Sequence, residues 1–414
     1  MINRVKLTAL GLAVVLGVSA CGATTPGAAT IASESPSATV DVGQLNPGAY
    51  PTTAAAPMGN ADGEQAGREV EGRRMAGYVV GPWQVDPALS RLTSGGPALM
   101  TDFKQLGAVV YATTMYQARA VSLIVGFSSE RGVADPAEPT RLRNAVLRFP
   151  DPATATAVAQ GLFDGAMNRL VMPDDSVDPV PAEPVRGIPV PGHPELSGVL
   201  FTFRVGDQTV REVSAFSAQG PFVLIQTARA AQGPERAAEL VGRALDLQVP
   251  LIDRFQPTDA AQIASLPLDP TGFAARTLAP KADPAPQRNG VYDAAGALHL
   301  EVDPVQVGQA LSDAGVDEVA ARLTTVYQAR DAEQARRLSG SLADTAANRP
   351  ASKPGAPVPG LPRSRCVLTD DTGGLLPRQR CFASVGRYAF GADSAQTETA
   401  YQQMAAQYRI LADS

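Results

Sequence analysis

The chain has 414 residues, of which 44% are hydrophobic, so it can bury a substantial core. It carries 35 Lys and Arg against 41 Asp and Glu, and no run of basic residues stands out. Because nucleic-acid binding needs a clustered positive surface, the composition argues against a nucleic-acid partner, and the length predicts about two domains.

The N-terminal sequence has the pattern of a bacterial lipoprotein signal peptide. Arg4 and Lys6 precede an apolar stretch at residues 7–18, which fits a signal-peptide core and is too short to span a membrane. The segment Val-Ser-Ala-Cys that ends at Cys21 resembles a lipobox. The resemblance implies a diacylglyceryl group on the Cys21 sulfur, cleavage after Ala20, and acylation of the new amine. The alternative is an ordinary signal peptide with an incidental cysteine.

The lipobox predicts that the mature chain is anchored in a membrane. We expect residues 1–20 to be removed, and Cys21 to attach the protein to the outer face of the cell membrane by lipid, palmitate included. Two or more acyl chains hold a protein stably, whereas one holds it marginally. Residues 21–40 are rich in Ala, Thr, Ser, Gly and Pro, which is typical of a flexible tether.

The remaining sequence predicts two α+β domains joined by a linker rich in Pro and Ala. We place the first domain, with an extended arm, at residues 41–256, the linker at 257–289 and the second domain at 290–414. Each domain is expected to be a largely antiparallel sheet with helices packed on one face.

The first domain alternates short strand patterns with two helical patterns. Strands are expected at 78–80, 107–112, 120–127, 144–149, 198–204, 209–217 and 222–228, and helices at 153–168 and 234–247.

The second domain repeats this plan. Strands are expected at 297–302, 323–329, 366–369 and 380–390, and helices at 304–314, 331–347 and 395–411. We interpret the repeat as an internal duplication, although Ala-rich helices also resemble one another by chance. If it is real, an apolar helix face covers each sheet through Val158, Leu162, Phe163, Leu338 and Leu342. The interface between domains is then the favoured place for a groove.

Two cysteines remain after lipidation, and they predict a structural disulfide. Cys366 and Cys381 flank a turn-forming segment, and disulfides persist in an extracytoplasmic compartment. A metal site or a redox pair is the alternative. The two histidines are isolated in the sequence and the spacing is not CxxC, which favours the structural disulfide across a hairpin.

No set of residues with catalytic or metal-binding spacing is present in the sequence. His193 lies in a proline-flanked loop, so we expect it to face solvent. His299 alternates with leucines in an expected strand, so we expect it to be solvated or to contact a neighbouring strand. Three aspartates, Asp174, Asp175 and Asp178, are the only candidate carboxylate cluster, and their loop lacks the apolar surroundings that would raise a pKa. We expect no cofactor and no metal.

Trp83 is the only tryptophan in the chain. It lines a binding surface or, as we expect, packs an N-terminal segment against the core.

Three segments carry a resemblance to a known family. They are DVGQLNPGAYPT at 41–52, EGRRMAGYVVGPWQVDPAL at 71–89 and GVYDAAGALHLEVDP at 290–304. Together with the lipobox, they resemble two-domain lipoproteins of mycolic-acid-containing actinobacteria. The resemblance implies a cell-envelope location and the two-domain division, and it brings no catalytic residues with it.

These patterns favour a binding protein over an enzyme. We expect a lipid-anchored, non-enzymatic envelope protein whose ligand is a lipid, a glycan or a protein. An envelope hydrolase with an unlocated site is one alternative, and a transporter-associated solute-binding protein is the other. Solute-binding proteins have parallel sheets, so the strand directions discriminate the last class.

Overall fold

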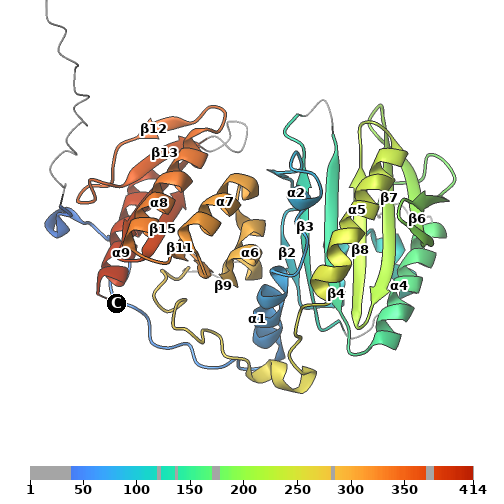
Figure 1. Ribbon diagram of the computed structural model, residues 1–414, viewed down its shortest axis with the longest axis horizontal. Coiled ribbons are helices and arrows are strands. Elements are labelled where there is room, and N and C mark those ends of the chain that lie inside the picture. Colours follow the sequence, from blue (N-terminus) through green and yellow to red (C-terminus); the bar gives the residue numbers. More distant parts are fainter. Residues whose placement is uncertain are drawn as a thin grey trace, which may run out of the picture. The chain divides into compact units, whose positions relative to one another are not determined.

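Two antiparallel sheets, one in each half of the chain, dominate the computed structural model (Figure 1). The structure describes residues 39–413, except 119–122, 136–138, 170–177, 281–284 and 370–376. The signal peptide, Cys21 and nearly all of the tether lie outside these residues. Across the described ranges, no helix combines the length and apolar character needed to cross a membrane.

The first sheet has the order β1-β3-β4-β8-β7-β6-β5, with β2 also paired to β3, and every pair is antiparallel. Its strands are β1 Arg91–Leu92, β2 Ala98–Met100, β3 Val125–Gly132, β4 Arg141–Arg148, β5 Arg186–Val190, β6 His193–Val205, β7 Gln208–Gln219 and β8 Phe222–Arg229. The helices of this half are α1 Glu64–Ala76, α2 Pro82–Val85, α3 Ala112–Ala118, α4 Pro152–Met167 and α5 Pro234–Ile252, with short 3-10 turns η1 Val42–Gln44, η2 Phe103–Ala108 and η3 Ala260–Ser265.

The second sheet has the order β12-β13-β14-β15-β11-β10-β9 and is also antiparallel throughout. Its strands are β9 Gly290–Asp293, β10 Glu318–Ala321, β11 Thr324–Gln328, β12 Lys353–Gly355, β13 Arg365–Thr369, β14 Arg378–Val385 and β15 Tyr388–Ser394. Its helices are α6 Ala294–Ala297, α7 Pro304–Ala314, α8 Ala332–Ala347 and α9 Thr397–Ala412, with 3-10 turns η4 Pro286–Arg288 and η5 Leu298–Leu300.

The two domains have the same topology, so the predicted relation between them is confirmed. In the first, β3 and β4 lead into α4, and β5 to β8 follow before α5. In the second, β10 and β11 lead into α8, and β12 to β15 follow before α9. The sheet orders correspond from edge to edge, with β1 and β9 in equivalent edge positions, and β2 is an additional strand of the first sheet. Asp151 and Asp331 cap α4 and α8 by accepting a backbone N–H three residues ahead.

The prediction that helices cover one face of each sheet is wrong, because both faces are covered. Along β4, Leu142 and Val146 face a core shared with α5, whereas Ala145 and Leu147 face the core under α4. Strand residues alternate between faces, so a strand that is apolar on both sides must be covered twice. In the second domain, α8 and α9 likewise contribute to different clusters.

Most of the helix residues that were expected to face a sheet are buried. Val158 and Leu162 of α4 are fully buried, as are Leu338 and Leu342 of α8. Phe163 is only partly buried, since it lies at the margin of the α4 contact.

Three expected strands are absent from the positions at which the sequence placed them. Residues 78–80 form a turn after α1, and 107–112 span the end of η2 and the start of α3. Residues 297–302 pass through the end of α6 and η5 instead. In each case a short apolar run is buried in helical or turn conformation, which periodicity alone does not distinguish from a strand.

The predicted disulfide is confirmed. Cys366 and Cys381 lie directly opposite each other on β13 and β14 and are bonded, with Cα atoms 4.1 Å apart. The turn between the strands lies outside the described residues.

His299 joins the two domains and is buried in a helical turn, so the expectation of a solvated or cross-strand histidine is wrong. It is 1% exposed, and its Nε2 lies 3.1 Å from the carbonyl oxygens of Ala76 and Val79. Its ring packs edge-on against Trp83 and Phe127. The helical turn of η5 directs the imidazole into the first domain instead of along a strand edge. Trp83 therefore packs against the core, as expected.

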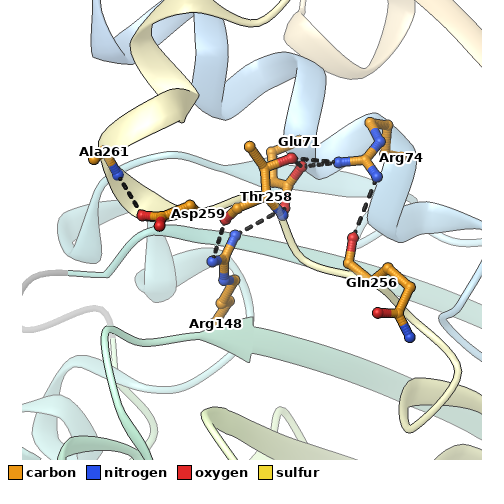
Figure 2. Close-up of polar contacts among 7 residues, drawn as sticks. All are labelled: Glu71, Arg74, Arg148, Gln256, Thr258, Asp259 and Ala261. Carbon is orange, nitrogen blue, oxygen red and sulfur yellow. Dashed lines mark hydrogen bonds and ion pairs between the residues drawn. The ribbon is translucent and has the colours of Figure 1, made fainter.

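A buried carboxylate fixes α1 to β4 and to the segment that follows α5. Figure 2 shows Glu71, which is fully buried, accepting from Arg148 at 2.7 Å and from the Thr258 N–H at 2.8 Å. Its other oxygen accepts from the Thr258 hydroxyl and from Arg74. Arg148 also donates to the Thr258 carbonyl. Each oxygen of this carboxylate has two donors, which is the arrangement a buried charge needs.

Candidate functional site

A charged cleft opens on the α4 face of the first sheet. Its volume is about 390 Å³, at the small end of the range for small-molecule sites. The walls contain arginines, aromatic rings and one carboxylate: Arg141, Arg143, Arg169, Arg229, Tyr111, Phe201, Phe203 and Glu212.

Strand alternation places these side chains on one face. On β4, Arg141 and Arg143 continue the row of Ala145 and Leu147, which lie under α4. Thr227 and Arg229 do the same on β8 beyond Ile225, and Glu212 and Ser214 do so on β7. The helix covers only one half of this face, and the charged half lines the cleft.

Two buried glutamates hold the strand arginines in place. Glu130 pairs with Arg143 at 2.5 Å and with Arg141 at 3.7 Å. Glu212 accepts from Arg229 at 2.7 Å and pairs with Arg141 at 3.5 Å. The side chains of Glu130 and Glu212 are 2% and 4% exposed, so buried carboxylates hold the guanidinium groups in place.

Arg169 differs from the other arginines because aromatic rings hold it. Its guanidinium carbon lies 3.8 Å from the centroid of Phe201 and 4.2 Å from that of Tyr111. Its Nη1 is buried and has no hydrogen-bond partner among the described residues. A buried donor without an acceptor costs free energy, so an oxygen acceptor bound at this point would stabilise the site.

The electrostatics of the cleft favour an anion. Four arginines lie beside two glutamates, and Asp178 adds one further negative charge that acts on Arg169. Burial lowers the pKa of Arg169, which marks a cation that lacks full compensation. Burial, together with Glu212, raises the pKa of Tyr111 to about 12, so its hydroxyl stays protonated and can donate. This set can orient and neutralise a carboxylate or a phosphate.

The residues that the sequence singled out are scattered in the structure. His193 lies at the start of β6, 3.1 Å from Asp246. Asp178 accepts from the Thr113 N–H and hydroxyl, at 2.8 Å each, and so holds the start of α3. Asp174 and Asp175 lie outside the described residues. Among the described residues, no group of three or more His, Cys, Asp and Glu side chains has metal-binding geometry.

None of the cleft residues was predicted from the sequence. The sequence does contain one signal. Arg141 and Arg143 occupy alternate positions of a strand, and the next two positions on the same face hold the apolar residues Ala145 and Leu147. Such a strand changes from polar to apolar along one face. The pattern becomes informative only once β6, β7 and β8 are placed beside it in register.

Comparisons with known proteins identify a family for the chain but no activity. No curated protein matches the chain. Among solved structures, the extracellular domain of PknH from Mycobacterium tuberculosis is similar over 45% of this chain and 97% of that one, with 16% identity and a TM-score of 0.30. That similarity is too low to carry an argument about fold or function. Two family models match the chain, "Domain of unknown function (DUF7373) N-terminal" over residues 58–268 and its C-terminal counterpart over residues 273–414. The chain therefore belongs to the DUF7373 family.

Proposed function

We propose that this protein is a lipid-anchored, extracytoplasmic binding protein that captures an anionic ligand in the arginine cleft and does not transform it. The observation that carries the proposal is Arg169, whose buried Nη1 has no acceptor among the described residues although it lines an open cleft. An anionic oxygen at that point would satisfy the donor and reduce the excess positive charge.

The arrangement favours binding over chemistry. The cleft arginines are fixed by Glu130, Glu212 and the aromatic rings, so their geometry exists before a ligand arrives. Such preorganisation reduces the entropy lost on binding. A hydrolase would need a base beside a nucleophile, and both of the chain's histidines lie elsewhere, His193 on the surface and His299 at the domain junction.

Two features support the proposed location. The lipobox supports an anchor at Cys21, and the bonded pair Cys366 and Cys381 fits an oxidising compartment. The antiparallel sheets disfavour a transporter-associated solute-binding protein, whose lobes are built on parallel sheets.

Native mass spectrometry of the protein released from its own membrane tests this function. We expect a co-purifying negatively charged molecule in the wild type, and its loss in Arg169→Gln. Arg337→Gln is the matched control, because Arg337 lies on the exposed surface of α8. The proposal fails if the wild type carries no anion, or if Arg169→Gln retains the same anion in the same proportion.

A further inference from the structure

A second cavity lies at the junction of the two domains, away from the arginine cleft. Its volume is about 510 Å³, and its walls combine apolar side chains with five charged ones, Arg73, Arg74, Asp293, Asp317 and Glu318. Val70 and Tyr78 come from α1 and the turn after it, Phe255 and Leu268 from the segment between the domains, and Val291 from β9. A cavity at a domain interface that combines apolar walls with polar groups is a common form of small-molecule site.

Backbone hydrogen bonds fix one wall of the cavity. The segment before α1 pairs with the segment between the domains, since the Ala61 N–H donates to the Leu266 carbonyl at 2.7 Å and the Leu268 N–H donates to the Gly59 carbonyl at 3.0 Å. This pairing fixes Leu268 and Pro267 as one wall. The site is therefore preformed and does not depend on a loop closing over it.

Two carboxylates lie opposite each other at the polar end of the cavity. Asp293 on β9 and Glu318 on β10 are direct partners in the antiparallel register and both line the cavity. Like charges in this position destabilise a sheet. Within the described ranges, neither carboxylate has an Arg or Lys nitrogen within 4.0 Å, so no direct ion pair relieves this repulsion.

Asp293 lies between two helix ends, because its Oδ1 accepts from the Gly296 N–H at 2.6 Å at the start of α6. Its carboxylate packs against Gly77, where a side-chain Cβ would come within 2.3 Å of Oδ2. Gly77 is the C-cap of α1, the negative end of that helix. Desolvation raises the pKa of both Asp293 and Glu318, while hydrogen bonds with the Gly296 N–H and with Thr271, respectively, offset part of the rise. A raised pKa at both positions agrees with carboxylates whose negative charge is only partly compensated.

The walls beside these carboxylates suit an organic cation. The rings of Tyr78 and Phe255 lie with centroids 5.1 Å apart. The guanidinium of Arg74 lies 5.7 Å from the Phe255 centroid and is itself part of the wall, so the Tyr78 ring is the one left for a ligand. Aromatic faces combined with carboxylates are the usual recognition elements for ammonium groups.

We propose that the junction cavity binds an amphipathic organic cation, with its ammonium group between Asp293 and Glu318 and its apolar body along Tyr78, Phe255 and Leu268. This site is independent of the arginine cleft, because the two share no lining residue and select opposite charges.

Calorimetric titration with n-octylammonium at pH 7, using n-octanol as the uncharged probe of equal length, tests the proposal. The wild type is expected to bind octylammonium saturably, with one site, and octanol at least ten-fold more weakly. The double variant Asp293→Asn/Glu318→Gln should lose at least ten-fold in octylammonium affinity. Asn at position 293 still caps α6, so the fold is preserved.

Two control variants and a labelling measurement distinguish this site from nonspecific binding of the alkyl chain. Asp313→Asn removes an exposed carboxylate on α7 and should leave octylammonium affinity unchanged, as should Arg169→Gln in the arginine cleft. A photoreactive diazirine derivative of octylamine should label the peptides that contain Phe255 and Leu268. Equal affinity for octanol, full affinity in the double variant, labelling only elsewhere, or no saturable binding would each overturn the proposal.

Discussion

Arg131 on β3 donates from Nη2 to the backbone carbonyl of His299 at 2.8 Å, and this bond joins the first domain to the second. The same nitrogen donates to the Glu301 carbonyl at 2.8 Å, and Nη1 donates to the Ser90 carbonyl at 3.0 Å. The guanidinium also lies 5.3 Å from the Trp83 ring centroid. Residues of two segments that carry the family resemblance, 71–89 and 290–304, therefore meet at this junction.

His299 makes the stability of the junction dependent on pH. Burial, assisted by the nearby Arg131 charge, lowers the pKa of His299 to about 3. An unfolded histidine has a pKa of about 6.5, so the contribution of His299 is complete above that pH and is lost as pH falls toward 3. We expect a loss of about 1.4 kcal/mol in unfolding free energy per pH unit below pH 6 from this residue.

Urea denaturation of the wild type and His299→Gln from pH 4.5 to 7.5 measures this effect. The difference between their unfolding free energies should shrink as pH falls, because only the wild type carries the buried imidazole. His193→Gln keeps His299 and should retain the loss of stability toward low pH. A difference that stays constant with pH would contradict the assignment.

The buried carboxylate of Glu71 predicts an asymmetry between single and double variants (Figure 2). Glu71→Leu leaves Arg148 buried without its carboxylate and should reduce the free energy of unfolding by about 3–5 kcal/mol. The double variant Glu71→Leu/Arg148→Leu should regain part of that loss, since two apolar side chains replace the pair. Chemical denaturation reports both values, and a double variant less stable than Glu71→Leu would refute this account.

The disulfide should stabilise the second domain without affecting the cleft. Its cysteines are 15 residues apart, and closing a loop of that size contributes about 3 kcal/mol. Cys366→Ala/Cys381→Ala should lower the unfolding free energy by that amount. Anion binding by the first domain should be unchanged, and a variant as stable as the wild type would show that the bond has no stabilising role.

Sequence patterns located the repeated framework well because its signals are local. Asp151 and Asp331 each precede an Ala-rich helix, and a helix cap is readable from adjacent residues. The short strands β1, β2, β5, β9, β10 and β12, which lie at or next to sheet edges, were not predicted, because pairing with neighbouring strands and not a local pattern defines them. The cleft was missed for the same reason, because Arg141 and Glu212 meet only through the strand order.

The lipid anchor is testable apart from the fold. Cys21→Ala should abolish acylation, so the protein should move from the detergent phase to the aqueous phase after phase separation. Mass spectrometry of the mature wild-type N-terminus should show cleavage before an acylated Cys21. An unmodified Cys21 in the membrane fraction, or membrane partitioning by the variant, would contradict the lipobox assignment.

The affinity of the arginine cleft for an anion tests the central claim most directly. Hexyl phosphate and hexanol share an apolar chain and differ in charge, so calorimetric titration with both isolates the contribution of the anion. The account predicts saturable binding of hexyl phosphate that weakens at least ten-fold in Arg169→Gln, is unchanged in Arg337→Gln and is absent for hexanol. Equal affinity of Arg169→Gln and the wild type for hexyl phosphate would contradict it.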